Sequence, residues 1–334
     1  MKKIGFLGTG AWGFCLAALL AKKGFQVVSW TRNKNLAQIL SSGKEHPHLP
    51  GITAPRGLKI TSNLIEALDG ASVIVESVTS AGLRFVFEEI KSLNKLDSQL
   101  IILTSKGIEQ NTRMILPDVV IDVLGDEFKS KVALLSGPSF AVDVVKGQPT
   151  SVVATGYSKE AIDGTCEVFN TEYFRVYPNS DVHGVAYAGA LKNIIAIACG
   201  ISDGLTLGHS AKAALMTRGL HEINKLALAH GCRIETMLGL AGMGDICLTC
   251  SSITSRNYRL GFLIAGGLNP DEAKKEIDMV VEGAYTCITA LQISEDLFVS
   301  MPITKIIYEI LYEGLSPKKA VQQLMQRAIK EEHL

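Results

Sequence analysis

A lysine and an asparagine interrupt an otherwise apolar stretch in this chain of 334 residues. Lys192 and Asn193 lie between Gly189-Ala190-Leu191 and the apolar run from Ile194 to Ala198. A buried ammonium group is costly unless it is paired or its pKa is lowered, so a lysine at such a place indicates chemistry. The alternative is that Lys192 lies near a helix end and extends its amine to water.

A glycine-rich segment follows the first predicted strand, Lys3 to Leu7. It reads Gly8-Thr9-Gly10-Ala11-Trp12-Gly13 and leads into the apolar helical stretch Phe14 to Leu20. Glycines at such positions permit a tight turn, close approach of the backbone to a pyrophosphate and close packing of the helix on the strand. The helix N-terminus attracts the phosphate charge. Because a second strand begins at Gln26, the order of elements predicts a dinucleotide site rather than an ordinary glycine turn.

The second predicted strand ends in Trp30-Thr31-Arg32-Asn33-Lys34, which contains no carboxylate. A site specific for NAD normally has Asp or Glu here, to bind the ribose hydroxyls. Arg32 could instead pair with the 2′-phosphate of NADP, so we expect both NADP and NAD to bind and NADP to be preferred. The alternative is that Arg32 is a solvated loop charge.

Further candidate residues follow the strands Leu100 to Thr104 and Val132 to Ser136. Lys106 follows the first of them, while Gly137 and Ser139 follow the second. Open α/β sheets bind ligands at the carboxyl ends of their strands. We therefore expect Lys106 to point into a crevice there, although it could also be a surface cation.

The later part of the chain contains Asp245, after Gly242-Met243-Gly244, and the tripeptide Ser255-Arg256-Asn257. Ser255 is a good helix N-cap, and Arg256 with Asn257 would add hydrogen-bond donors at the positive end of that helix. Such an arrangement could bind a phosphate group, although the tripeptide alone would also fit ordinary helix capping.

The elements that must position these residues change in character along the chain. Short β-branched runs alternate with helical patterns up to Asn179, and helical patterns alone follow from His183. This order predicts an α/β fold: a Rossmann-type, mostly parallel sheet followed by an all-helical C-terminal domain. We expect a dinucleotide-binding domain over 1–182 and a helical substrate and catalytic domain over 183–334. The remaining predicted strands are Ser72 to Val78, Thr150 to Ala154 and Tyr173 to Tyr177.

Composition narrows the class of protein. Lys plus Arg and Asp plus Glu number 33 each, so the formal net charge is +0 and a nucleic-acid partner is not expected. The mean hydropathy is +0.23, yet no apolar run approaches the roughly 20 residues of a membrane span, so we expect a cytoplasmic protein without stable membrane insertion. Seven scattered cysteines fit reduced thiols. Cys247 and Cys250 lack a second ligand pair, so no metal site is expected.

Taken together, these segments resemble the bacterial NAD(P)-dependent glycerol-3-phosphate dehydrogenases. The resemblance extends in order over nearly the whole chain. It rests on the Gly8 loop, SKGIE at 105–109, LSGPSFA at 135–141, GALKN at 189–193, TRGL at 217–220, SRN at 255–257 and VVEG at 280–283. Related hydroxy-acid dehydrogenases place the lysine and asparagine about one helical turn apart, whereas here they are adjacent.

The resemblance implies a reaction and a set of roles. Dihydroxyacetone phosphate and sn-glycerol 3-phosphate would be interconverted by hydride transfer, supplying glycerol 3-phosphate for phospholipid synthesis. Lys192 would be the catalytic proton acceptor and donor, and Lys106 and Asp245 would act beside it. Further substrate positions would be Gly137, Ser139, Asn193, Thr249, Ser255, Arg256 and Asn257. Cofactor positions would be Gly8, Gly10, Ala11, Trp12, Gly13, Arg32, Lys106, Ala141, Arg256, Val280 and Glu282.

Other functions stay open at this stage. A hydroxy-acid or ketopantoate-type reductase would share the architecture but would need a carboxylate anchor in place of Ser255-Arg256-Asn257. A non-enzymatic NAD(P) sensor would have little reason to keep Lys106, Lys192 and Asp245 together, and a purely structural Rossmann protein would need neither set. The sequence permits a homodimer without requiring one.

Overall fold

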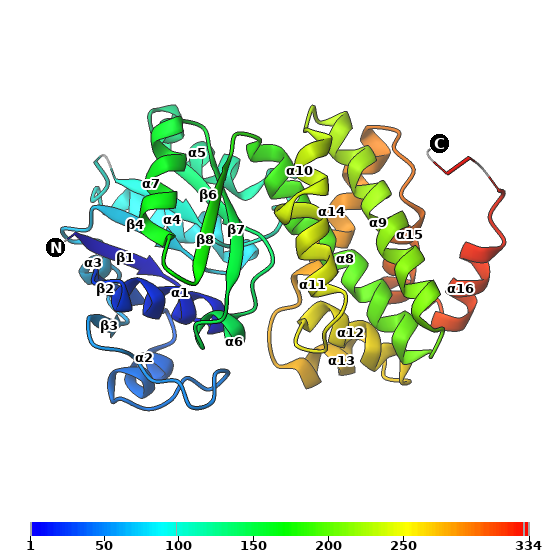
Figure 1. The fold of residues 1–334 in the computed structure, drawn as a ribbon, viewed down its shortest axis with the longest axis horizontal. Coiled ribbons are helices and arrows are strands. Elements are labelled where there is room, and N and C mark those ends of the chain that lie inside the picture. The colour runs from blue at the N-terminus through cyan, green and yellow to red at the C-terminus, as the bar shows by residue number, and fades with distance from the viewer. Residues whose placement is uncertain (1, 98, 330, 333–334) are drawn as a thin grey trace. The chain divides into compact units, whose positions relative to one another are not determined.

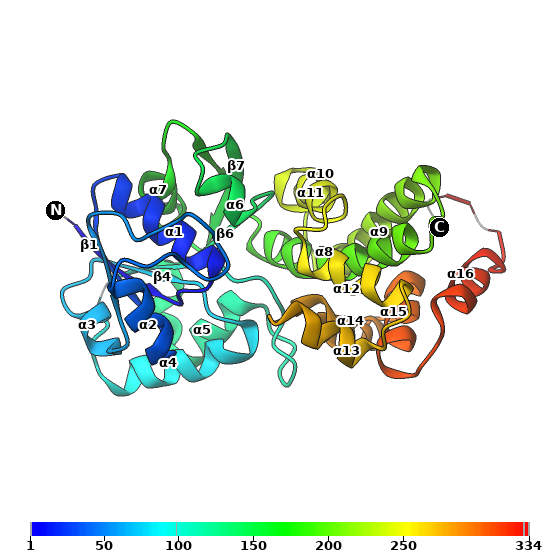
Figure 2. The same ribbon diagram turned by 90° about the horizontal axis from the view of Figure 1, so that it is seen from below.

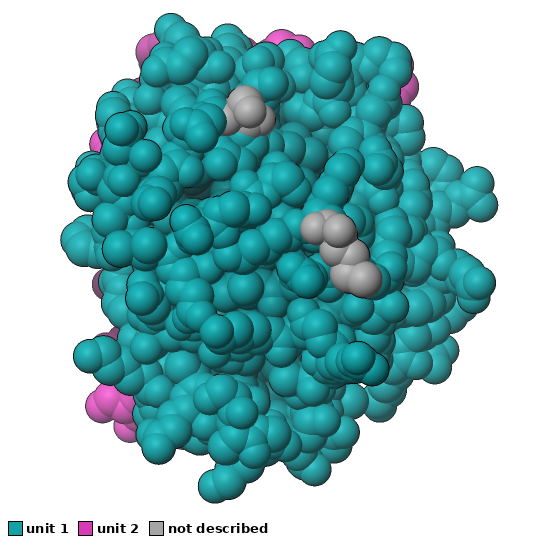
Figure 3. All heavy atoms as spheres, turned by 90° about the vertical axis from the view of Figure 1, so that its left-hand side faces the viewer, with its two compact units in different colours: residues 1–105, 116–182 teal, residues 106–115, 183–334 magenta. Residues whose placement is uncertain are grey.

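The computed structural model describes residues 2–97, 99–329 and 331–332. The chain divides into two units by its internal contacts, shown in separate colours in Figure 3. The first comprises residues 1–105 and 116–182, and the second comprises residues 106–115 and 183–334. Lys106 therefore belongs to the same unit as Lys192 and Asp245.

The first unit contains an eight-stranded sheet in the order β3-β2-β1-β4-β5-β6-β7-β8 (Figure 1). All neighbouring strands are parallel except β6 and β7, which are antiparallel. The predicted Rossmann-type, mostly parallel sheet is thus confirmed. The strands are β1 (Lys3–Leu7), β2 (Gln26–Trp30), β3 (Leu58–Thr61), β4 (Val73–Glu76), β5 (Leu100–Leu103), β6 (Val132–Ser136), β7 (Thr150–Gly156) and β8 (Phe174–Asn179).

Helices cover both faces of this sheet, with α1, α6 and α7 on one face and α4 and α5 on the other (Figure 2). Burial on both faces explains why most residues of β1 and β4 are apolar, Lys3 and Glu76 being the exceptions. The helices are α1 (Ala11–Lys22), α2 (Lys34–Ser41), α3 (Leu64–Leu68), η1 (Ser80–Gly82), α4 (Leu83–Ser92), α5 (Leu116–Leu124), η2 (Asp126–Lys131), α6 (Ala141–Val144) and α7 (Lys159–Phe169).

Strand β3 was missed in the sequence, and several predicted strand ends were wrong. β3 has four residues and carries the exposed Lys59, so its alternation is too short to stand out from the surrounding loop. β4 and β5 end earlier than predicted, at Glu76 and Leu103. β7 and β8 extend further, because six consecutive residues of each pair with the other.

The second unit is helical, as predicted, apart from its segment 106–115. Its longest helix, α8, begins at Val182 and is apolar on all sides. Among the described residues it is the one helix long and apolar enough to cross a membrane, but its apolar window is entirely buried inside the protein. The helices are α8 (Val182–Gly204), α9 (His209–Ala229), α10 (Ile234–Leu238), η3 (Leu240–Gly244), α11 (Asp245–Thr249), α12 (Arg256–Ala265), α13 (Pro270–Ile277), α14 (Glu282–Asp296), α15 (Pro302–Tyr312) and α16 (Pro317–Met325).

Helices α8 and α12 cross in backbone contact. A Cβ atom on Gly261 of α12 would lie 2.0 Å from the carbonyl oxygen of Ile197, and one on Gly200 of α8 would lie 2.0 Å from that of Tyr258. A side chain at either position would force the two helices apart. Because Asn257 lies in the first turn of α12 and Asn193 lies on α8, this crossing also fixes how closely the two asparagines approach.

Replacing Gly261 with alanine therefore tests the crossing. Although alanine favours helix by about 1 kcal/mol, the methyl group has only backbone to displace, so we expect a net loss of about 1–3 kcal/mol in the free energy of unfolding. Urea unfolding followed by circular dichroism measures this loss. Gly164→Ala is the matched control, because a Cβ there would meet the movable end of Leu100. Equal effects of the two substitutions would contradict the account.

Candidate active site

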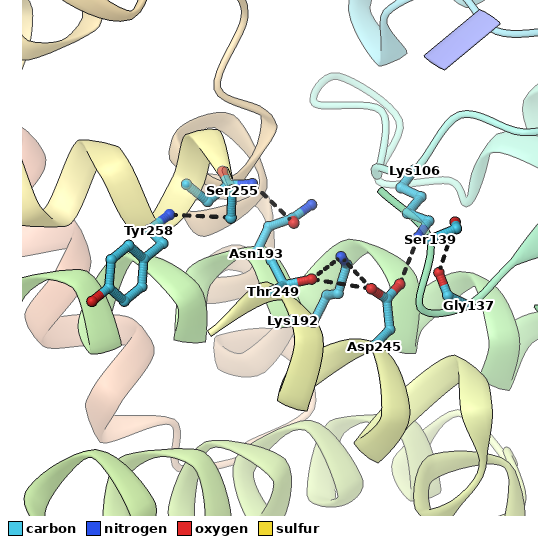
Figure 4. A network of polar contacts seen from close by, with 10 residues as sticks. Lys106, Gly137, Ser139, Lys192, Asn193, Asp245, Thr249, Ser255 and Tyr258 are labelled. Atoms are coloured by element: carbon cyan, nitrogen blue, oxygen red, sulfur yellow. Dashed lines mark hydrogen bonds and ion pairs between the residues drawn. The ribbon is translucent and has the colours of Figure 1, made fainter. Parts of the chain in front are cut away.

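Asp245 holds both candidate lysines in the helical unit (Figure 4). Its Oδ1 accepts a hydrogen bond from Lys192 Nζ at 2.7 Å, and its Oδ2 accepts one from Lys106 Nζ at 2.5 Å. Thr249 completes the network, since its hydroxyl accepts from Lys192 at 2.5 Å and donates to Asp245 Oδ1 at 3.0 Å. Lys192 is 6 % exposed and Asp245 is 1 % exposed. Lys192 is thus buried and paired, and it does not extend to water.

Burial and charge set the protonation of this network. Burial lowers the pKa of Lys192 to about 8, with repulsion from Lys106 adding to the effect and Asp245 opposing it. Burial alone would raise the pKa of Asp245, but the two ammonium groups outweigh it and the pKa falls below its usual value. Asp245 is therefore ionised at neutral pH, while Lys192 can gain or lose a proton near the pH of the cell.

Local backbone structure brings Asp245 to this position. A single π-helical turn, η3, passes directly into α11, whose first residue is Asp245. Gly242 in that turn packs so closely that a Cβ would lie 2.0 Å from the carbonyl oxygen of Met237. Such turns are frequent at functional sites because they shift the residues that follow. The glycines before Asp245 thus serve to place its carboxylate.

A second polar network begins at Asn193, the residue after Lys192. Asn257 Nδ2 donates to Asn193 Oδ1 at 2.9 Å, and Asn257 Oδ1 accepts from Gly283 N at 2.9 Å. Both asparagine side chains are buried. Asn257 therefore links α8, α12 and α14, a structural role that its position within a tripeptide did not reveal.

The start of α12 has the features of an anion site. Ser255 is the N-cap, and its hydroxyl accepts from Tyr258 N. Arg256 is exposed and donates through Nη1 to the carbonyl oxygen of Val280 at 2.8 Å. Val280 is 40 % exposed, and Glu282 begins α14 two residues later. The exposed Arg256 thus adds positive charge at the N-terminus of a ten-residue helix.

Glycines let the glycine-rich loop of the first unit pack tightly against neighbouring backbone. Gly8 has φ +102° and a Cβ there would lie 2.4 Å from the carbonyl oxygen of Ser77, while one on Gly13 would lie 2.2 Å from that of Gly8. Gly10 is the N-cap of α1 and offers no side chain to the first turn. The first-turn amides of α1, at Ala11 and the half-buried Trp12, therefore lack a side-chain cap and fit a phosphate group.

Other candidates of the first unit lie on neighbouring loops. Arg32 is exposed at the end of β2, with its guanidinium carbon 4.7 Å from the centre of the Phe85 ring. Ala141 begins α6, and its carbonyl oxygen accepts from the Cys15 thiol at 3.4 Å. Ser139 donates to the carbonyl oxygen of Gly137 at 3.2 Å, just beyond the end of β6. Among the residues that the structure describes, no carboxylate forms an ion pair with the Arg32 guanidinium that would compete with a phosphate.

Two buried polar residues near the glycine loop were missed in the sequence. Nδ1 of His46 accepts a hydrogen bond from the backbone amide of His48. Its Nε2 therefore carries the proton and donates to the carbonyl oxygen of Thr9 at 3.1 Å. Glu76 ends β4 and is fully buried. An acidic residue closing an apolar strand is a signal that could have singled out Glu76, whereas a histidine in a long loop offers none.

Comparison with known proteins identifies the family. The model of the N-terminal domain of NAD-dependent glycerol-3-phosphate dehydrogenase matches residues 3–162, and the model of its C-terminal domain matches residues 181–322. The two matches together span most of the chain, and every candidate residue named above lies within one of them.

Individual proteins agree with this match. The chain is 59 % identical over 334 residues to a glycerol-3-phosphate dehydrogenase [NAD(P)+] of Protochlamydia amoebophila, covering 100 % of both chains. It is 51 % identical to that of Chlamydia muridarum, covering 99 % of both. A crystal structure of the glycerol-3-phosphate dehydrogenase from Coxiella burnetii is 36 % identical, with a TM-score of 0.92, and covers 98 % of this chain and 99 % of its own. The chain belongs to the NAD-dependent glycerol-3-phosphate dehydrogenase family.

Proposed function

We propose that this protein interconverts dihydroxyacetone phosphate and sn-glycerol 3-phosphate with NADP or NAD as the hydride carrier. The observation that carries the proposal is the pair of lysines on one buried carboxylate, Lys106 and Lys192 on Asp245. The reaction adds a hydride to C2 and a proton to its oxygen. A second candidate, reduction of a hydroxy-acid precursor, is not favoured by any contact of the described residues.

The nicotinamide supplies the hydride when the cofactor is bound, and the residues of the helical unit handle the proton. The Lys192 ammonium gives its proton to the carbonyl oxygen as negative charge develops there, and in the reverse direction the neutral amine takes the proton from the hydroxyl. Lys106 adds a second positive charge toward that oxygen. Asp245 and Thr249 orient the Lys192 amine, because both of its observed hydrogen bonds go to them.

We assign the phosphate of the substrate to the start of α12. Ser255, Arg256 and Asn257 combine a helix N-terminus with a guanidinium group, and both attract an anion. Asn193 would help to hold the substrate carbonyl in place, and Asn257 holds Asn193 in turn. Gly137 and Ser139 are further substrate positions, which rest on the family resemblance.

We assign the cofactor to the glycine loop of the first unit. Gly8, Gly10, Ala11, Trp12 and Gly13 fit the pyrophosphate, because Gly8 and Gly13 allow the tight turn and Gly10 leaves the first-turn amides of α1 without a side-chain cap. Arg32 would pair with the 2′-phosphate of NADP. By resemblance, Lys106, Ala141, Arg256, Val280 and Glu282 are further cofactor positions.

The same proposal assigns dinucleotide binding to 1–182 and substrate binding with catalysis to 183–334. It places the enzyme in the cytoplasm, where it supplies glycerol 3-phosphate for phospholipid synthesis, and allows it to work as a homodimer. The equal numbers of acidic and basic residues support a small-molecule partner rather than a nucleic acid.

Lys192→Ala should remove most turnover and leave cofactor binding nearly intact. Loss of both the proton and the charge should lower kcat on the order of a thousandfold, whereas Asp245 keeps Lys106 as a partner. Cofactor oxidation with dihydroxyacetone phosphate measures kcat, and fluorescence titration measures cofactor affinity. Lys212→Ala, which breaks a 2.6 Å pair with Asp203 on the same unit, is the control. Turnover within a few fold of the parent would rule out Lys192 as the proton donor.

Arg32→Ala should weaken NADPH far more than NADH, by roughly 1.5–3 kcal/mol for one charge-assisted contact. The ratio of kcat/KM values for the two cofactors measures the effect. Arg175→Ala is a matched control, because Arg175 also lies over an aromatic ring, that of Tyr177 at the opposite edge of the sheet. If both cofactors weakened equally, Arg32 would not read the 2′-phosphate.

Arg256→Ala should strongly lower the rate with dihydroxyacetone phosphate. It should change the slow rate with dihydroxyacetone little. Binding of the remote phosphate positions the carbonyl, so dihydroxyacetone itself should lose kcat as well as affinity. Rates for both substrates on both proteins form a cycle. Arg259→Ala, three residues along α12 and paired with Glu276, controls for general effects on the helix. An equal fractional loss on the two substrates would show that Arg256 acts through the cofactor or the fold.

A further inference from the structure

Glu76 lies at the carboxyl edge of the sheet, between the strand that leads to the glycine loop and the strand that leads to Lys106. In β4 it is paired with Leu7 of β1 on one side and with Leu103 of β5 on the other. Its side chain is fully buried. Burying a carboxyl group between two neighbouring strands costs free energy unless it is hydrogen-bonded. Its hydrogen-bond partners therefore indicate which part of the structure it stabilises.

Most of the hydrogen bonds of Glu76 converge on the two residues that precede Lys106. Its backbone carbonyl accepts from the amide of Thr104 at 2.9 Å and from the Thr104 hydroxyl at 2.8 Å. Its side-chain Oε1 accepts from the Ser105 hydroxyl at 2.7 Å. The chain therefore leaves β5 through two residues that are both fastened to Glu76, and Lys106 is the next residue.

The same carboxyl group also holds the loop after β4. Oε1 accepts from the amide of Val78 at 2.5 Å, and the Ser105 hydroxyl contacts the Val78 carbonyl oxygen at 2.5 Å. Ser77, between them, is the residue whose carbonyl a Cβ on Gly8 would meet. Glu76 thus joins the loops that follow β4 and β5, and the first of these packs against the glycine loop at Gly8.

We propose that Glu76 is a positioning residue that sets the place of Lys106 by fastening Thr104 and Ser105. The proposal rests on the proposed role of Lys106 in the reaction. Glu76 is placed to act through the backbone that leads to Lys106, and it needs no contact with the substrate to do so.

The chemistry of the carboxyl group supports an acceptor role that does not require charge. Oε2 is buried and has no hydrogen-bond partner among the residues that the structure describes. Burial raises the pKa of Glu76 to about 7, against hydrogen bonds from Ser105, Val78 and Thr104 that lower it. In a fraction of the molecules, the Glu76 side chain is therefore protonated at neutral pH. Glutamine keeps the acceptor oxygen without the charge, so we expect it to preserve the hydrogen bonds of Glu76.

Three substitutions test the proposal in the full-length enzyme. The measured quantity is kcat for dihydroxyacetone phosphate, divided by the concentration of enzyme that binds cofactor so that unfolded protein is not counted. Glu76→Leu removes the acceptor and should lower kcat at least tenfold. Ser105→Ala, which adds no volume and should fold normally, should lower it several fold. Glu76→Gln should stay within about threefold of the parent. Ser72→Ala is the control and should leave kcat unchanged. Ser72 precedes β4 at the end of the strand opposite to Glu76, and its hydroxyl donates to the carbonyl oxygen of Lys3.

The decisive comparison repeats these substitutions on a Lys106→Ala enzyme. If Glu76 acts through Lys106, Glu76→Leu and Ser105→Ala should each change the remaining kcat less than threefold there. Equal losses with and without Lys106, or parent-like kcat in both single variants, would overturn the proposal. Parent-like turnover of Lys106→Ala alone would refute the assigned role of Lys106 and the inference with it, so the two failures can be told apart.

Discussion

One carboxylate shared by two lysines is the interaction on which the helical unit depends for its chemistry. Asp245 is separated from Lys192 by 53 residues and from Lys106 by 139, yet it holds both amines within hydrogen-bond distance. Without it, two positive charges would face each other in a buried site, and the cost of an unpaired buried charge reaches several kcal/mol. With it, the network has one net positive charge, available to stabilise an oxyanion.

The surrounding architecture serves to keep that network dry and fixed. Lys192 lies on a helix that is apolar on all sides, so its amine is desolvated and its pKa falls to about 8. The glycine crossing of α8 and α12 brings Asn193 and Asn257 into hydrogen-bond contact next to it. Burial and repulsion lower the pKa of Lys192 while Asp245 limits the fall, and the balance leaves a group that exchanges its proton near neutral pH.

Much of the fold and of the site could be predicted from the sequence, especially where a residue type is unusual for the segment that contains it. Lys192 in an apolar run and glycines after a strand each pointed to a site, and the alternation of strands and helices predicted the sheet. β3 was missed because four residues carry too little periodicity. The link from Asn257 to Gly283 and the fastening of Ser105 by Glu76 depend on contacts between distant segments, which no local pattern encodes.

The central claim is that Asp245 tunes Lys192 as the proton donor, and the pH dependence of kcat/KM for dihydroxyacetone phosphate reduction tests it most directly. Because the ammonium form must donate, the parent enzyme should lose activity as pH rises through about 8. Asp245 raises the pKa of Lys192, so in Asp245→Asn the midpoint of this decline should move to lower pH by about 1 unit or more. A decline at the same pH in both enzymes would contradict the account.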